Sequence, residues 1–338
     1  MDIAKLAATA QELVAPGKGI LAADESSGTI KKRFDGIGVI SSEETRRAYR
    51  DLLFTTRGAE EHISGVILFD ETIRQSSADG TPFPKLLASK GIIPGIKVDK
   101  GAKELAGFPG EKVTEGLDGL RDRLIEYVSL GARFAKWRAV ITIGDEMPTA
   151  TCIDANAHAL ARYASLCQET GLVPIVEPEV LMDGGHDIDI CETVTTVTLA
   201  TVFAELMAFG VEFEGMLLKP NMVISGTECQ EQAGVAEVAE ATLRCFRQTV
   251  PAAVPGIVFL SGGQSAVLAT AHLNAMNRIG DAPWELSFSY GRALQAPPLA
   301  AWGGKQENVG AAQQAYLHRA ALNGAARYGK YTADMENA

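Results

Sequence analysis

Lys219 is the residue whose surroundings in the sequence most strongly suggest chemistry. It follows Gly215-Met-Leu-Leu, a run that should be buried on both faces, and it precedes Pro220. Desolvation and a neighbouring cation such as Lys136 would favour the neutral amine there, and a neutral amine in a dry pocket attacks carbonyl carbons. A purely structural lysine is the alternative at this position.

Three pairs of charged residues, each pair separated by a single residue, stand at the ends of other apolar runs. They are Lys97 with Asp99, Lys136 with Arg138, and Glu177 with Glu179. Residues i and i+2 of a strand point to the same face, so all six charges can face one site. A single charge at a strand end is often only the solvated start of a loop, but the repetition favours a site.

Two later turns have the composition of anion-binding loops. They read Ser261-Gly-Gly-Gln264 and Ser289-Tyr-Gly-Arg292. Glycine lets backbone N–H groups approach an anion, and arginine adds a fork of donors. A Ser-Gly-Gly turn is common in proteins, so the expectation of a phosphate site depends on where these turns lie in the fold.

Metal and hydrolase chemistry have little support in the sequence. The five histidines include no His-x-x-x-His pair, and only His186, within a glycine-rich stretch, stands out. No Gly-x-Ser-x-Gly motif occurs, and the five cysteines are widely spaced without a Cys-x-x-Cys motif. We therefore expect neither a metal nor a cofactor.

Composition excludes several partners. The 338 residues are 46% hydrophobic and 22% charged, which is the balance of a globular chain with a large core. A net charge of −11 leaves no broad cationic surface for nucleic acid or an anionic membrane. Without a signal-like N-terminus, a run of 18 apolar residues or a disulfide framework, the chain is expected in the cytoplasm.

Eight short apolar runs read as buried strands that position these residues. They cover residues 19–24, 65–70, 93–99, 132–138, 172–179, 213–219, 256–261 and 284–289. Helical periodicity lies between them at 117–128 before Gly131, at 160–167 before Gly171, and at about 231–249 and 306–328.

Eight strand–helix units without a linker predict an α/β fold, a closed parallel (β/α)8 TIM barrel. An open doubly wound sheet is the alternative, but it would place a glycine-rich phosphate turn after the first strand, where the chain reads Asp24-Glu-Ser-Ser-Gly28. We expect a single domain over 1–338, with a leading helix at 1–16, the barrel at 17–329 and a polar tail at 330–338. In a barrel, the charged strand ends and the turns after strands seven and eight meet on the catalytic face.

Several long segments make the chain resemble class I fructose-1,6-bisphosphate aldolases over roughly residues 17–331. The clearest are Gly19-Ile-Leu-Ala-Ala-Asp-Glu-Ser26, Phe134-Ala-Lys-Trp-Arg138, Ile175-Val-Glu-Pro-Glu179, Glu214-Gly-Met-Leu-Leu-Lys-Pro-Asn221 and Phe288-Ser-Tyr-Gly-Arg-Ala-Leu-Gln295. The resemblance implies reversible, metal-independent cleavage of fructose 1,6-bisphosphate to dihydroxyacetone phosphate and glyceraldehyde 3-phosphate.

The resemblance also implies catalytic roles. Lys219 would form a Schiff base with the C2 ketone, and Glu177 would help the carbinolamine lose water. Lys136 with Glu179 would tune and orient the site. Asp24 would take the C4 hydroxyl proton as the C3–C4 bond breaks.

Sugar-phosphate binding and assembly are implied in the same way. The C1 phosphate would bind at Ser261, Gly262, Ser289, Gly291 and Arg292, and the C6 phosphate at or near Ser26, Arg33, Lys97 and Arg138. Family members suggest a homotetramer. Many of them end in a tyrosine that assists proton exchange, whereas this sequence ends Tyr331-Thr-Ala-Asp-Met-Glu-Asn-Ala338, so that role stays unassigned.

Two alternative functions remain open from the sequence. The chain could be another Schiff-base enzyme, such as a transaldolase or a heptulose-bisphosphate aldolase, although two phosphate clusters favour a bisphosphate. It could also be a non-catalytic scaffold on the same fold. The presence of Asp24, Lys136, Glu177 and Lys219 together argues against lost catalysis.

Overall fold

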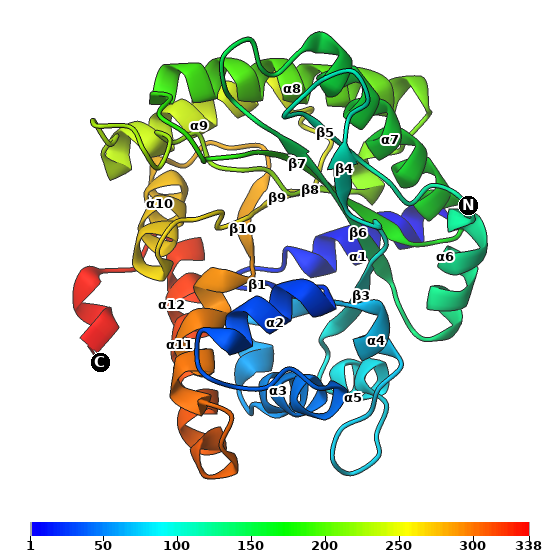
Figure 1. The fold of residues 1–338 in the computed structure, drawn as a ribbon, viewed down its shortest axis with the longest axis vertical. Coiled ribbons are helices and arrows are strands. Elements are labelled where there is room, and N and C mark those ends of the chain that lie inside the picture. Colours follow the sequence, from blue (N-terminus) through cyan, green and yellow to red (C-terminus); the bar gives the residue numbers. More distant parts are fainter. Residues whose placement is uncertain (1, 338) are drawn as a thin grey trace.

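A closed barrel of eight parallel strands forms the centre of the molecule (Figure 1). The computed structural model describes residues 2–337. Neighbouring strands follow one another along the chain, and the barrel closes between the first and the last. The strands are β1 (Gly19–Ala23), β2 (Ile63–Leu68), β3 (Ile93–Lys97), β6 (Phe134–Ile141), β7 (Val173–Val180), β8 (Leu217–Leu218), β9 (Gly256–Phe259) and β10 (Glu285–Tyr290). The predicted (β/α)8 barrel is confirmed, and the doubly wound alternative is wrong.

Helices surround the barrel and return the chain from one strand to the next (Figure 1). They are α1 (Ile3–Leu13), α2 (Ser27–Asp35), α3 (Glu43–Thr55), α4 (Asp70–Ile73), α5 (Phe83–Ser89), α6 (Leu120–Ser129), α7 (Ala150–Glu169), α8 (Ile188–Ala208), α9 (Val235–Thr249), α10 (Ala266–Ile279), α11 (Arg292–Trp302) and α12 (Val309–Arg327). Gly131 and Gly171 follow α6 and α7 with φ of 105° and 82°. These positive values are the reason that glycine ends both helices.

Some boundaries differ from the sequence-based expectation. Of the predicted strand 213–219, only Leu217–Leu218 is a strand, because residues Phe213–Gly215 form a 3-10 turn. A two-stranded hairpin, β4 (Ala102–Glu104) with β5 (Lys112–Thr114), was not predicted, since three-residue strands show too little alternation. Residue 1 of the predicted leading helix and residue 338 of the predicted tail lie outside the described residues.

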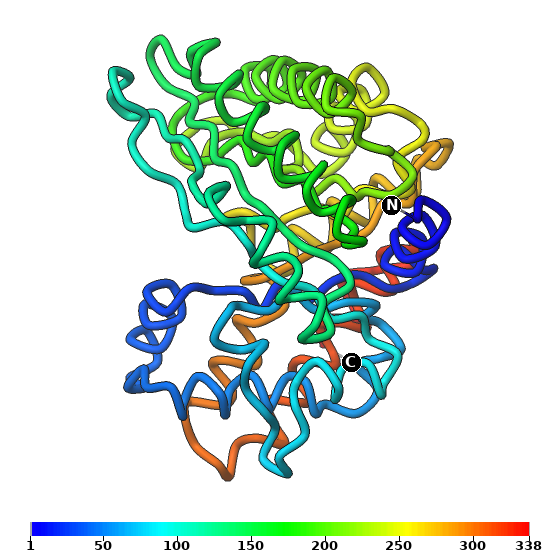
Figure 2. Tube along the Cα trace, turned by 90° about the vertical axis from the view of Figure 1, so that its right-hand side faces the viewer, coloured from blue at the N-terminus to red at the C-terminus, as the bar shows by residue number. Residues whose placement is uncertain are grey.

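Helix α1, which forms the leading segment, packs on the core of the barrel. Leu6, Ala10 and Leu13 are buried in one cluster with the inward-facing Ile20 and Phe134. Burying each leucine contributes about 2 kcal/mol. The end of α12 reaches the same side, where Arg327 donates to the Val14 carbonyl at 3.1 Å. Figure 2 shows the blue helix α1 beside red segments from the C-terminal part of the chain.

Helix α8 is long and apolar enough to cross a membrane by length and composition, the one such helix in residues 2–337. Length and composition do not distinguish a membrane span from a helix of a folded domain. In this structure α8 packs between α7 and α9 in the outer layer of the barrel (Figure 1).

Candidate active site

A cavity of about 370 Å³ opens at the carboxyl ends of the strands. All fourteen residues predicted from the sequence line it: Asp24, Ser26, Arg33, Lys97, Lys136, Arg138, Glu177, Glu179, Lys219, Ser261, Gly262, Ser289, Gly291 and Arg292. The strands converge there, so charges far apart in the sequence share one space.

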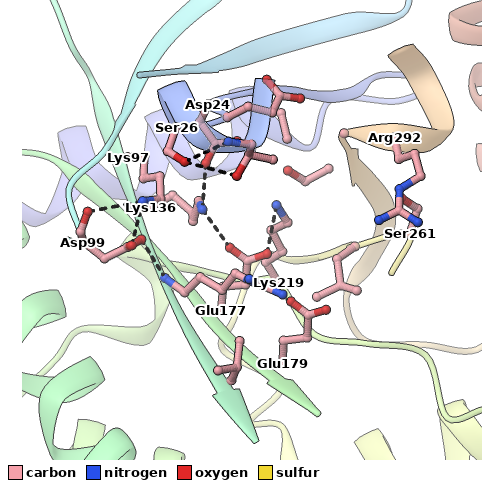
Figure 3. A pocket seen from close by; sticks show the side chains of 18 of the residues that line it. Asp24, Ser26, Lys97, Asp99, Lys136, Glu177, Glu179, Lys219, Ser261 and Arg292 are labelled. Carbon is pink, nitrogen blue, oxygen red and sulfur yellow. Dashed lines mark hydrogen bonds and ion pairs between the residues drawn. The ribbon is translucent and has the colours of Figure 1, made fainter. Parts of the chain in front are cut away.

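Four charges alternate at the centre of the cavity, three of them buried and the fourth, Asp24, partly buried (Figure 3). The Lys136 Nζ atom lies 2.7 Å from Asp24 Oδ2 and 3.1 Å from Glu177 Oε2. The other Glu177 oxygen lies 3.1 Å from Lys219 Nζ. Each ammonium therefore contacts a carboxylate, and Glu177 bridges the two lysines.

The alternation fixes the ionisation of the two carboxylates. Burial raises the pKa of Asp24, but Lys136 and Lys219 outweigh it and hold that pKa well below its usual range. The pKa of Glu177 is lowered for the same reason, because burial is outweighed by Lys136, Lys219 and Arg138. Burial lowers the pKa of Lys136, and the charges of Asp24 and Glu177 outweigh it and raise that pKa. All three groups are charged near pH 7.

The surroundings of Lys219 differ from the sequence-based expectation. Its side chain is buried, as expected, but the nearest charge is the Glu177 carboxylate and not the Lys136 ammonium. The Glu177 carboxylate lies close enough to exchange a proton directly with the Lys219 nitrogen.

Glu179 pairs with a different cation from the one expected. Arg138 donates from Nε to a Glu179 oxygen, whereas Lys136 contacts Asp24 and Glu177. Lys136 is buried and Arg138 is exposed, so the two residues reach different depths of the cavity.

One end of the cavity presents hydroxyl and backbone donors beside Arg292. Ser261 and Arg292 lie together there, away from Lys97 (Figure 3). The Ser289 hydroxyl is buried and has no hydrogen-bond partner among residues 2–337. Gly291 precedes the first residue of α11, and a helix N-terminus favours an anion. This end therefore offers several donors to an anion.

The opposite end contains Lys97 and Ser26. Lys97 Nζ lies 2.8 Å from Asp99 Oδ1, and Ser26 caps the N-terminus of α2. Arg33 is not at this end, in contrast to the expectation. It lies beside Gly291, with Nη2 3.8 Å from where a Cβ atom on that glycine would be. Seven residues of helix separate Ser26 from Arg33 by about 10 Å, which places them at opposite ends of α2.

A network around Glu25, at the edge of the cavity, was not predicted from the sequence. Arg33 pairs with one Glu25 oxygen, and Arg50 lies 2.5 Å from the other. The Gln295 amide also donates to Glu25, at 2.7 Å. Glu25 directly follows Asp24, which was the only local signal, while Arg50 and Gln295 reach it from distant helices.

The described residues contain no group of three or more His, Cys, Asp or Glu side chains that could hold a metal ion. A parallel barrel whose cavity holds a buried lysine beside a carboxylate, with cationic or hydroxyl donors at both ends, defines a class of enzyme. It is the class of barrel lyases that handle phosphorylated carbonyl compounds through a lysine.

Comparisons with known proteins identify the family within that class. The family model for fructose-bisphosphate aldolase class-I matches residues 5–338. A probable fructose-bisphosphate aldolase class 1 of Xanthomonas campestris is 62% identical over 98% of this chain and 99% of its own length. The cytosolic fructose-bisphosphate aldolase 6 of Arabidopsis thaliana is 57% identical over 98% of this chain and 93% of its own.

A solved structure agrees with these matches. The fructose-bisphosphate aldolase of Plasmodium falciparum, solved with TRAP and a small-molecule inhibitor, is 53% identical, with a TM-score of 0.96 over 98% of this chain and 96% of its own. The chain belongs to the class I fructose-bisphosphate aldolase family. Its reaction is the reversible cleavage of fructose 1,6-bisphosphate, a carbon–carbon lyase reaction.

Proposed function

We propose that Lys219 is the nucleophile of this aldolase. The observation that carries the proposal is the buried Lys219 Nζ atom 3.1 Å from Glu177 Oε1 inside the cavity. Glu177 takes the ammonium proton, and the freed amine attacks the C2 ketone. Glu177 then returns a proton to the carbinolamine oxygen, which leaves as water and produces a cationic imine.

Asp24 is the base for carbon–carbon cleavage in this proposal. Its low pKa keeps it ionised, ready to take the C4 hydroxyl proton. The C3–C4 electron pair then moves into the imine cation, which replaces a metal as electron sink. Lys136 contacts both Asp24 and Glu177, so it holds the two carboxylates in place and in their charged forms.

The two ends of the cavity suit the two phosphate groups of a bisphosphate substrate. The end with Ser261, Ser289 and Arg292 takes the C1 phosphate, and the end with Lys97 and Ser26 takes the C6 phosphate. Lys219 lies between these ends (Figure 3). The sugar would therefore lie across the four central charges.

Borohydride trapping tests the proposal. Reduction in the presence of fructose 1,6-bisphosphate should add mass at Lys219, located by peptide mapping, and Lys219→Met should neither trap nor cleave. Lys97→Met is the matched control: it should weaken binding and still trap at Lys219. Labelling of another lysine, or loss of activity on chelation, contradicts this mechanism. Binding without cleavage by the natural chain would favour the scaffold.

We further propose a cytoplasmic homotetramer. Two Arabidopsis relatives carry the word cytosolic in their names, and the five cysteines are free. Ile190, Val197 and Met207 on α8 are 45%, 49% and 67% exposed, which suits a face that a second copy covers. Light scattering should give four times the mass of one chain, and the mass of a single chain would contradict the tetramer.

A further inference from the structure

The side chain of Gln264 is held in place from α10. Gln264 closes the turn that begins at Ser261, since its N–H donates to the Ser261 carbonyl at 3.1 Å. Its side chain is buried, and its Oε1 atom lies 2.6 Å from Nδ1 of the buried His272 of α10. The phosphate turn is thus tied to a histidine that lies outside the cavity lining.

The hydrogen bond defines the state of His272. An amide oxygen only accepts, so Nδ1 must carry the proton and donate it. Burial lowers the pKa of His272 to about 4, so the ring is neutral near pH 7. Its Nε2 atom has no hydrogen-bond partner among the described residues. The only polar partner of the ring there is therefore Gln264.

The amide nitrogen of Gln264 contacts the segment that follows Lys219. Its Nε2 atom donates to the sulfur of Met222 at 3.6 Å. Next to this contact, the Leu260 N–H donates to the Pro220 carbonyl at 3.1 Å. The turn and the segment after the lysine are therefore joined by one backbone bond and one side-chain bridge.

We propose that His272 and Gln264 are positioning residues that fix the phosphate turn relative to Lys219. This inference rests on the proposed function, in which Ser261 and Gly262 bind the phosphate next to the reacting ketone. Without the His272 donor, the buried Gln264 oxygen would lack a partner, and the side chain and the turn would shift to find one. The phosphate would lose its aligned donors, whereas Lys219 would keep Glu177.

Two imine-forming probes distinguish a defect in the phosphate turn from a defect at Lys219. Dihydroxyacetone phosphate carries the phosphate next to its carbonyl, and dihydroxyacetone lacks it. In borohydride trapping, His272→Leu should raise the half-saturating concentration of dihydroxyacetone phosphate about tenfold, the factor that corresponds to about 1.4 kcal/mol. The value for dihydroxyacetone should not change.

Three further variants complete the experiment. His272→Asn places an amide nitrogen where Nδ1 stood and should restore phosphate selectivity. Gln264→Met removes the bridge itself and should match His272→Leu, which keeps the test open if the leucine variant does not fold. Asn277→Ala removes another hydrogen-bonding side chain of α10, whose amide donates to the Leu286 carbonyl instead, and should change neither probe.

The outcomes distinguish the positioning role of His272 and Gln264 from the proposed function of Lys219. An equal loss with both probes would overturn the positioning role, since it would show general damage to the site. Unchanged selectivity in both His272→Leu and Gln264→Met would overturn it as well. Failure of the natural chain to trap either probe at Lys219 would instead refute the proposed function.

Discussion

In the proposed mechanism, Lys136 neutralises two carboxylates, Asp24 and Glu177. Asp24 and Glu177 are close to the same ammonium, so neither can be altered without changing the charge balance of the other. Breaking one contact of a buried charge cluster leaves the remaining charges incompletely paired. The pH dependence of stability and the rate of imine trapping can therefore distinguish the roles of Asp24 and Glu177.

Replacing Asp24 should change how stability depends on pH. The pKa of Asp24 in the folded protein lies below the ordinary value of 3.8. The ionised Asp24 therefore stabilises the fold above pH 3.8, and this stabilisation is lost as the pH falls through the folded-state pKa. Asp24→Asn should thus be less stable than the natural chain at pH 7. The difference in urea-unfolding free energy should shrink below about pH 4. A difference that grows with acidification would contradict the assigned ion pair.

Replacing Glu177 should slow imine formation. Glu177→Gln keeps the shape but cannot take the Lys219 proton, so the trapping rate should fall about 10²- to 10⁴-fold. Glu179→Gln is the matched control, since Glu179 lies two residues further along β7 and pairs with Arg138. Rapid-quench trapping measures both rates, and an equal decrease in the two variants would exclude the assigned role of Glu177.

At the scale of elements, neighbouring strands of the barrel pack closely where a small residue faces a large one. A Cβ atom on Gly95 of β3 would lie 2.3 Å from the Phe134 ring of the neighbouring β6. Phe134 also belongs to the buried cluster that includes α1. A side chain at residue 95 would therefore push β3, the strand that carries Lys97, away from Phe134.

Gly95→Ala should destabilise the protein by about 1–3 kcal/mol, because the Phe134 ring and strand β3 must move apart. Gly310→Ala in α12 is the control, since a Cβ atom there meets nothing within 4 Å. The control should be neutral or slightly stabilising. Urea unfolding compares the two variants, and equal stability would show that the barrel accommodates the added methyl group.

At the scale of the whole molecule, the end of the chain is attached to the outer helices. Arg319 of α12 is 3% exposed and donates to both Glu336 oxygens, at 2.7 and 2.6 Å. The Tyr331 hydroxyl donates to Glu336 as well, at 2.7 Å. With α1 packed on the opposite strand ends, we propose that the chain folds as a single domain.

Glu336→Gln should lower the free energy of unfolding by about 2 kcal/mol, since a buried arginine loses a charged hydrogen-bond partner. Asp334→Asn makes the same charge change at an exposed position of the same 3-10 turn and should leave stability unchanged. Urea unfolding of both variants is the measurement. If the two behave alike, the segment does not contribute to the fold.

The sequence by itself predicted the eight strands, the barrel and the fourteen residues that line one cavity. Buried strands are apolar runs, and the repetition of charges at their ends indicated one site. The family resemblance added residues such as Ser26 and Arg33. The family resemblance supplied the roles of Lys219, Glu177 and Asp24. It was also sufficient for the aldolase function, which the relatives confirm.

Only the tertiary structure decided which side chains contact each other. It paired Glu179 with Arg138, placed Arg33 beside Gly291, and joined Glu25 to Arg50. These partners come from different strands and helices, and the register and closure of the barrel bring them together. A linear sequence carries the type of each residue, but the distance between two residues on separate elements exists only once the barrel has closed.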